Sequence, residues 1–130
     1  MMLKDIQIIE NRELIKICFI RAKLMELLAI EMGQNDKRLE YFMAGMFSSI
    51  DVLLNKDMKT IVNEIVLTHD VNEALLGGDN EIKRVLDLVL NYELIKWDVF
   101  KKNKTAFKIS QDKFMSLYVK ALMWVKKLSY

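Results

Sequence analysis

The chain contains no proline and only four glycines in 130 residues. Proline breaks the interior of a helix and glycine weakens it, so their scarcity leaves few points at which a helix must stop. No stretch alternates apolar and polar β-branched residues for long enough to predict a sheet. We therefore predict an all-α fold, a compact bundle of about six helices.

Helical periodicity and capping residues divide the chain into six predicted helices. The first covers Leu14 to Met32, with Asn11 as its N-cap and Gly33 as its end. Asp36 is expected to cap the second, which bends between Ser48 and Asp51. The remaining four are a short helix near 58–65, one near 68–76 ended by Gly77 and Gly78, a long one over 81–100 opened by Asp79 or Asn80, and one capped by Ser110 that runs to the C-terminus. The length suits one domain, so we expect 1–130 to be a single helical domain.

Composition excludes several classes of protein. The formal net charge of +2 gives no general attraction for polyanions. Cys18 is the only cysteine and cannot form an internal disulfide. The most apolar segment carries five charges in nineteen residues, which excludes an ordinary membrane span: Lys16, Arg21, Lys23, Glu26 and Glu31. Without a recognisable signal peptide, we expect a cytoplasmic protein that does not bind membranes.

The segment "LTHDV" places His69 beside Asp70. This doublet resembles the one that defines the HD superfamily of metal-dependent phosphohydrolases. A divalent metal needs three or four protein ligands, and His69 is the only histidine of the chain. We therefore predict a helix start with no metal ligand, in which Thr68 or Asp70 caps the first turn and Glu73 completes a capping box.

No catalytic apparatus is recognisable elsewhere. The chain has no phosphate-binding glycine loop, no paired cysteines, and no serine or cysteine with an available histidine base. "GGDN", from Gly77 to Asn80, is explained by the end of one helix and the start of the next. We predict no catalytic residue and no cofactor, and hence a protein that is not an enzyme.

Five segments in order along the chain resemble a known family. They are "RAKLMELLA", "FMAGMFSSIDVLL", "EIVLTHDVNEALL", "VLDLVLNYELIKWDV" and "YVKALMWV". Together they are similar to the C-terminal part of the HDOD domain, in the version that follows an EAL phosphodiesterase domain in bacterial cyclic di-GMP signalling proteins. The most specific elements are "F-x-x-G-x-x-S-x-x-D", which contains Gly45, Ser48 and Asp51, and "YE-x-x-x-W", formed by Tyr92, Glu93 and Trp97.

This resemblance implies a helical fold related to that of HD hydrolases, without their metal ligands. It implies a non-catalytic regulatory or protein-interaction module in bacterial signal transduction, with an EAL domain in cis or in trans as the expected protein partner. The sequence contains no EAL domain, and the first helices of an HDOD module are not recognisable. We therefore expect the C-terminal portion of such a module.

Several motif residues have a physical interpretation of their own. Gly45 inside a helix costs about 1 kcal/mol relative to alanine, which indicates that another helix crosses there. Ser48, Ser49 and Asp51 are expected to bond backbone groups where the helix breaks. Because an unpaired charge in an apolar helix is costly, we favour a partly buried ionic cluster of Arg21, Glu26 and Asp51 over three solvated side chains. Four aromatic residues follow helical spacing and are expected in the core or an interface: Tyr92, Trp97, Tyr118 and Trp124.

Charge is unevenly distributed along the chain. Residues 94–130 hold nine lysines against Asp98 and Asp112, a balance of +7, while the first 93 residues carry 11 − 16 = −5. A solvated basic face is the ordinary interpretation, and docking onto an acidic partner domain is the sharper one. Two alternative functions stay open: a degenerate HD-type phosphohydrolase, and weak nucleic-acid binding through these lysines, which we do not favour.

The first predicted helix also bears on self-association. Hydrophobic residues make up 52% of the chain, and Phe19, Ile20, Leu24 and Leu27 are expected to face away from the stripe that enters the core. Exposed apolar patches usually mark contact surfaces, and a symmetric dimer is the simplest way to bury one. We therefore expect a homodimer that uses these four residues.

Overall fold

The computed structural model describes residues 2–93 and 109–128, and for residues 2–10 the backbone alone. These residues form seven α-helices and one short 3-10 helix, and the described part of the chain contains no strand. The all-α prediction is confirmed. The elements are α1 (Met2–Glu31), η1 (Asn35–Lys37), α2 (Arg38–Phe47), α3 (Ile50–Leu54), α4 (Met58–Glu64), α5 (His69–Leu75), α6 (Glu81–Glu93) and α8 (Gln111–Lys126).

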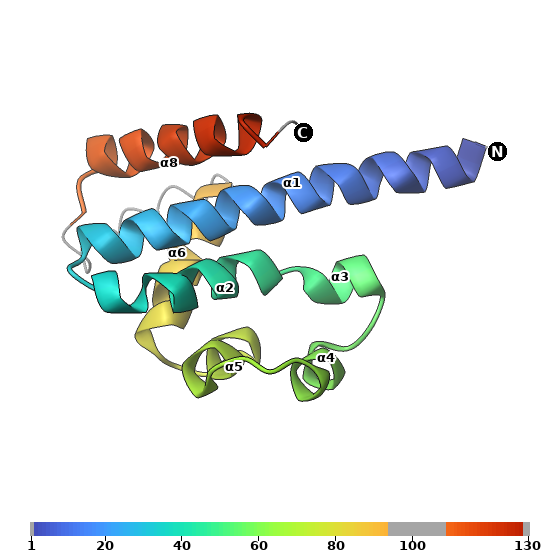
Figure 1. Ribbon diagram of the computed structural model, residues 1–130, viewed down its shortest axis with the longest axis horizontal. Coiled ribbons are helices and arrows are strands. Elements are labelled where there is room, and N and C mark those ends of the chain that lie inside the picture. Colours follow the sequence, from blue (N-terminus) through green and yellow to red (C-terminus); the bar gives the residue numbers. More distant parts are fainter. Residues whose placement is uncertain (1, 94–108, 129–130) are drawn as a thin grey trace.

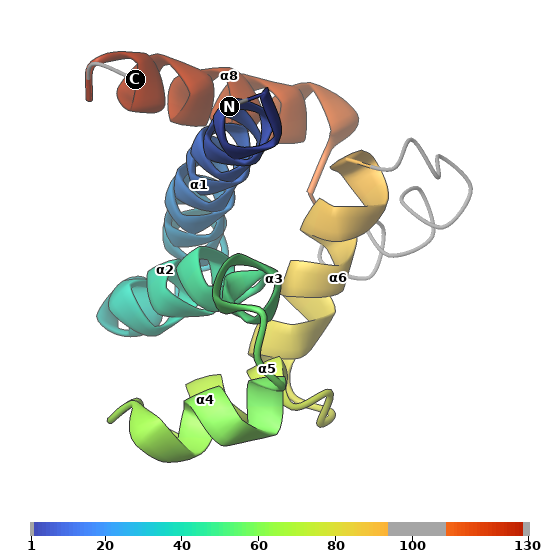
Figure 2. The same cartoon turned by 90° about the vertical axis from the view of Figure 1, so that its right-hand side faces the viewer.

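Helix α1 is the central element. Figure 1 shows it lying between α8 on one side and α2 on the other, with its N-terminal part extending past both. In Figure 2, α6 is seen to approach α1 from a third side. Apolar residues occur almost all around α1, so three neighbouring helices are needed to cover them. Its fully buried residues are Ala22, Leu24, Met25, Leu28 and Ala29, each 0% exposed.

The other helices pack around α1 and complete one hydrophobic core. Phe114 of α8, Tyr41 of α2 and Val85 of α6 are at most 1% exposed and belong to the same hydrophobic cluster as α1. Helix α5 packs beneath α2 and adds Val71 and Ala74 to this cluster. Helices α3 and α4 lie at the periphery, where α3 has no buried residue.

The predicted start of the first helix is wrong and its predicted end is confirmed. Asn11 lies inside α1, which begins at Met2, because residues 2–10 contain no proline or glycine to stop it. At the other end Gly33 adopts φ +78°, and the amide of Gln34 donates to the carbonyl of Ala29 at 2.8 Å, as a left-handed helix end requires. Asp36 does not cap α2, because it lies within η1.

The other helix boundaries follow their predicted signals. The chain breaks at Ser48 and Ser49, where the Ser48 hydroxyl donates to the carbonyl of Gly45 at 2.8 Å. Asn80 caps α6 by accepting from the amide of Lys83 at 2.9 Å, and Ser110 caps α8 by accepting from the amide of Lys113 at 3.0 Å. The predicted extension of α6 to residue 100 lies outside the described residues.

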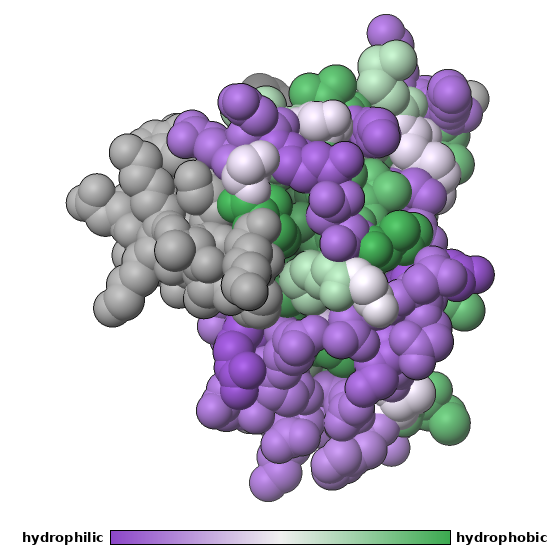
Figure 3. Space-filling model, turned by 90° about the vertical axis from the view of Figure 1, so that its left-hand side faces the viewer, coloured by the Kyte–Doolittle hydropathy of each residue, from purple (hydrophilic) through white to green (hydrophobic). Residues whose placement is uncertain are grey.

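Among the described residues no helix is both long and apolar enough to cross a bilayer. Figure 3 shows a side of the molecule on which apolar atoms form a band between two mainly hydrophilic areas. The exposed large apolar residues include Leu39 of α2 at 66% and Val66, before α5, at 99%.

Candidate functional site

Gly45 marks the closest approach of α2 to α1. A Cβ atom on Gly45 would lie 2.7 Å from the carbonyl oxygen of Arg21 and 2.8 Å from the Cα of Ala22. Both contacts are with backbone that cannot move aside, so α2 can reach this position only with glycine. The close helix crossing predicted from Gly45 is therefore confirmed. It places the end of α2 beside the side chain of Arg21.

Arg21 joins three parts of the fold. Its Nε donates to Glu93 Oε1 at 2.9 Å and its Nη2 pairs with Glu93 Oε2 at 2.9 Å, the geometry of a two-pronged ion pair. Its Nη1 donates to the hydroxyl of Ser49 at 2.6 Å and to that of Ser48 at 3.2 Å. The Arg21 and Glu93 side chains are only 12% and 20% exposed. We call Arg21, Glu93, Ser48 and Ser49 the Arg21 joint; it links α1, the break after α2, and the end of α6.

The predicted cluster of Arg21, Glu26 and Asp51 is wrong in its partners. Glu26 pairs with Lys23 at 2.7 Å, and Asp51 makes no ion pair among the described residues. Positions 21 and 26 are five residues apart and therefore point in different directions from the helix axis. The charge of Arg21 is instead met by Glu93, which is 72 positions away in the sequence.

Cys18 lies one turn before Arg21 and is 2% exposed. Burial raises the pKa of its thiol above the ordinary value, and the nearby Arg21 charge lowers it by a smaller amount. A reactive cysteine needs the opposite conditions, a lowered pKa together with access to solvent. The thiol therefore acts as a packing group beneath the Arg21 joint.

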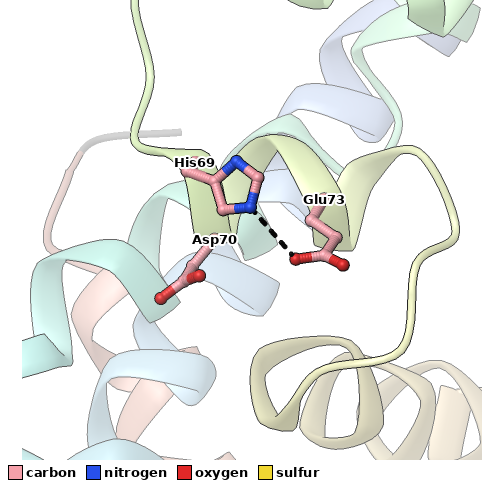
Figure 4. A group of neighbouring side chains, drawn as sticks. All are labelled: His69, Asp70 and Glu73. Carbon is pink, nitrogen blue, oxygen red and sulfur yellow. Dashed lines mark ion pairs between the residues drawn. The ribbon is translucent and has the colours of Figure 1, made fainter.

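The His69–Asp70 doublet stands on the surface at the start of α5. His69 Nε2 lies 3.5 Å from Glu73 Oε2, and the two side chains are 88% and 41% exposed. Figure 4 shows these two side chains turned toward one another. With Asp70, one ligand atom from each residue falls within 4.8 Å of the others. All three residues come from one helix of seven residues, so further ligands for a catalytic metal would have to come from other elements.

The capping prediction for this segment is confirmed for Thr68 and corrected for Asp70. The hydroxyl of Thr68 accepts from the amide of Val71 at 3.4 Å, which makes Thr68 the N-cap of α5. Asp70 lies in the first turn, where its charge favours the positive end of the helix dipole without a capping bond.

Two groups of aromatic residues hold α8 against the rest of the molecule. The ring of Tyr92 lies 4.8 Å from Phe114 and 5.0 Å from Tyr118, measured between centroids. Trp124 contacts Phe19 at 6.3 Å and Phe42 at 6.2 Å, with the Lys23 ammonium 5.2 Å from its ring. This packing agrees with the predicted core and interface aromatics. Trp97 lies outside the described residues.

The surface predicted for self-association is mostly covered by the chain itself. Leu24 is 0% exposed, so its prediction as a surface residue is wrong. Phe19 packs on Trp124, and Ile20 and Leu27 are partly buried against the core. Trp124 of α8 covers Phe19, a contact that the pattern of α1 alone could not reveal. The homodimer itself stays a prediction.

Sequence reasoning missed a polar pocket of about 180 Å³ between α2, α5 and α6. It is lined by Gln34, Lys37, Tyr41, Asp70, Asn80, Glu81 and Ile82. The hydroxyl of Tyr41 donates to Glu81 Oε1 at 2.8 Å. Burial, and secondly this bond to Glu81, raise the pKa of Tyr41 above its ordinary value. No spacing in the sequence connects residues 41 and 81, so nothing signalled the pair.

Comparison with known proteins gives two informative similarities. The chain is 37% identical over 118 residues to a Bacillus subtilis protein described as uncharacterized protein YuxH, covering 91% of this chain and 28% of that protein. It is 30% identical over 86 residues to the cyclic di-GMP phosphodiesterase CdgJ of Vibrio cholerae, covering 66% of this chain and 20% of that protein. No family model and no solved structure matches the chain. The chain thus spans less than a third of the length of either curated relative, and one of them is named as a protein of cyclic di-GMP metabolism.

Proposed function

We propose that this chain is a non-catalytic regulatory module of the HDOD type, which acts through protein contacts in bacterial cyclic di-GMP signalling. The similarity to part of a protein named as a cyclic di-GMP phosphodiesterase supports the pathway. The expected partner is an EAL phosphodiesterase domain, either on the same polypeptide or on another.

The non-catalytic assignment is carried by one observation about the donor groups. The chain has a single histidine, and its side chain is 88% exposed beside Glu73 of the same short helix. A hydrolytic metal centre requires ligands that converge from several elements on a position closed from bulk water. The Arg21 joint cannot serve as a metal site, because its one carboxylate, that of Glu93, already binds the Arg21 guanidinium.

A degenerate HD-type phosphohydrolase is the rival function, and the grouping of His69, Asp70 and Glu73 favours it. Against it, Asp70 lines the polar pocket near α5, whereas His69 and Glu73 are not among the residues that line it. A metal held by all three groups would have the 88% exposed His69 as a ligand and would therefore lie open to bulk water. We assign the group a surface role.

The proposal is tested by adding the purified chain to EAL-domain phosphodiesterases encoded in the same genome. Conversion of cyclic di-GMP to the linear dinucleotide is followed by chromatography at increasing concentrations of the chain. We expect at least one of these enzymes to show a saturable change in rate of about twofold or more, which corresponds to a change in activation free energy of about 0.4 kcal/mol. The variant Lys59→Glu, changed at an exposed position of α4, serves as the control and is expected to act like the parent chain. Unchanged rates and no binding with every such enzyme would refute the partner assignment.

A further inference from the structure

Helix α8 carries a second apolar flank in addition to the one that enters the core. Its buried residues are Phe114, Leu117, Ala121 and Val125. Met115, Val119 and Leu122 are 40%, 48% and 39% exposed. These three follow i, i+4, i+7 spacing, so they share one flank of the helix. A helix of a small protein has no structural need for such a flank in water.

The exposed flank continues into a groove between α8 and α1. One hollow, of about 350 Å³, is lined by Ile17, Ile20, Arg21, Glu93 and Tyr118. A second, of about 150 Å³, is lined by Lys16, Ile20, Leu122, Val125 and Lys126. The two hollows share Ile20 and therefore adjoin along the line where α1 and α8 meet. We call the residues that line them the α1–α8 groove.

The rim of this groove is positively charged. The sequence has no aspartate or glutamate from residue 113 to residue 130. Lys126 lines the groove and has no acidic partner among the described residues, as is also true of Lys120 and Lys127 on other faces of this end of α8. Inside the groove the charges of Arg21 and Glu93 neutralise each other. Lys16 pairs with Glu13 at 3.6 Å, but the Glu13 side chain is 60% exposed, so this pair adds little.

We propose that the α1–α8 groove docks an acidic amphipathic helix of a partner protein. From Tyr118 to Lys126 the groove follows α8 over eight residue steps, about 12 Å or two helical turns. A helix of that length places apolar side chains at i, i+4 and i+7 against Ile17, Ile20 and Leu122, and carboxylates beside Lys126. The proposal rests on the proposed function, since it identifies the surface through which the module binds a partner.

Charge complementarity separates this occupant from a second copy of the chain. A copy docked through the same surface would bring its own Lys126, and the other unpaired lysines at that end of α8, toward Lys126 of the first copy. Like charges in contact across an interface are strongly unfavourable and select against such a pair. An acidic helix instead places carboxylates against the lysines. Its binding is favoured both by these opposite charges and by burial of the apolar flank.

The test uses fluorescence anisotropy with a labelled synthetic peptide of about 14 residues, long enough to cover the groove. The peptide carries leucine at i, i+4 and i+7 and glutamate at most other positions; a matched peptide carries lysine in place of every glutamate. We expect saturable micromolar binding of the acidic peptide, at least tenfold weaker binding of the basic one, and weakening by added salt.

Two substitutions in the groove are paired with two outside it. Leu122→Glu is expected to weaken binding of the acidic peptide at least tenfold. Lys126→Glu is expected to weaken it several-fold and to make binding less dependent on salt. Leu39→Glu on α2 and Lys59→Glu on α4 change exposed residues outside the groove and should leave the affinity unchanged. Circular dichroism of each variant verifies that all four are folded.

Three outcomes would overturn the proposal. The first is no saturable binding of the acidic peptide, or equal losses for Leu39→Glu and Leu122→Glu. The second is binding to phosphatidylglycerol vesicles that Leu122→Glu abolishes and the peptide cannot displace, which would assign the groove to a membrane surface. The third is self-association that Leu122→Glu abolishes, which would assign it to a second copy. Regulation of an EAL enzyme by a Leu122→Glu chain would refute the docking site while leaving the proposed function intact.

Discussion

Among single residues, Arg21 has the clearest energetic role in the fold. It is a charged group between apolar neighbours with a side chain only 12% exposed, and two carboxylate oxygens and two hydroxyls satisfy its guanidinium. A buried pair of this kind adds little net stability compared with apolar packing, yet the loss of one partner leaves a charge buried without compensation. The Arg21 joint therefore fixes the relative positions of α1, α2 and α6 more than it adds to stability.

Glu93→Gln is predicted to lower the free energy of unfolding by about 3 kcal/mol, because Arg21 keeps its charge and loses its counter-ion. Urea denaturation followed by circular dichroism measures the change. Glu64→Gln is the matched control: its pair with Lys56 at 3.8 Å is 59% exposed on the Glu64 side, and the expected change is below about 0.5 kcal/mol. Equal effects of the two substitutions would show that Glu93 is not compensating a buried charge.

Residue types alone revealed part of the Arg21 joint. An arginine between apolar neighbours correctly signalled that a partner was needed, and Gly45 correctly signalled a close crossing. The identity of the partner followed from the path of the chain, since Glu93 reaches Arg21 only when α6 packs beside α1. The helical repeat assigns neighbours within a turn and contains no information on contacts 72 residues apart.

At the scale of elements, capping chemistry located most helix ends because it is local. Ser110, Asn80 and Gly33 act at the predicted positions. The two wrong predictions also have local causes. Asn11 has a side chain that can cap a helix, but α1 already begins at Met2 and continues through it. Asp36 lies in the 3-10 helix η1 and not at the start of α2. Burial of individual faces was less predictable, because α1 is apolar on several sides and the position of α8 decides which residues are covered.

The start of α5 gives a prediction for one helix end. Thr68→Ala should lower the free energy of unfolding by about 1 kcal/mol through loss of the cap, and Asp70→Asn by about 0.3–1 kcal/mol through the helix dipole alone. His69→Ala should change stability little, since its side chain is 88% exposed. Thermal unfolding of the three variants provides the comparison. A loss of stability for His69→Ala as large as that for Thr68→Ala would mean that His69 makes an interaction on which the fold depends.

The contact between α2 and α6 gives a prediction in alkaline solution. Burial and the bond to Glu81 raise the pKa of Tyr41 above 10.0, so the folded state favours the neutral phenol. This contribution to stability is fully present below pH 10.0 and is lost as pH rises toward the raised pKa of the folded state.

Tyr41→Phe should therefore destabilise the protein by about 1 kcal/mol near neutral pH, through loss of the hydrogen bond to Glu81. The difference from the parent chain should shrink between about pH 8 and about pH 11, because only the parent has a Tyr41 phenol that ionises on unfolding. Urea denaturation at the two pH values measures both differences. A difference that stays constant with pH would contradict the assignment.

For the whole molecule, composition was sufficient to predict the fold class and insufficient to predict the surface. The absence of proline and the helical repeats led to an all-α chain, and the described residues are all-α. Phe19, Ile20, Leu24 and Leu27 were assigned to an exposed face, yet Leu24 is fully buried, Phe19 packs on Trp124 of α8, and Ile20 and Leu27 pack against the core. The exposed apolar flank is on α8, because exposure is a property of the whole folded molecule and no single helix defines it.

The most direct test of the non-catalytic assignment is metal binding together with hydrolysis. Protein purified without chelator is analysed for transition metals, and its turnover of cyclic di-GMP and of the linear dinucleotide is measured with added Mn²⁺, Ni²⁺ or Fe²⁺. We expect substoichiometric metal and no turnover above the rate of the buffer, for the parent chain and for His69→Ala alike. Stoichiometric metal and a hydrolytic rate that both disappear in His69→Ala would contradict it.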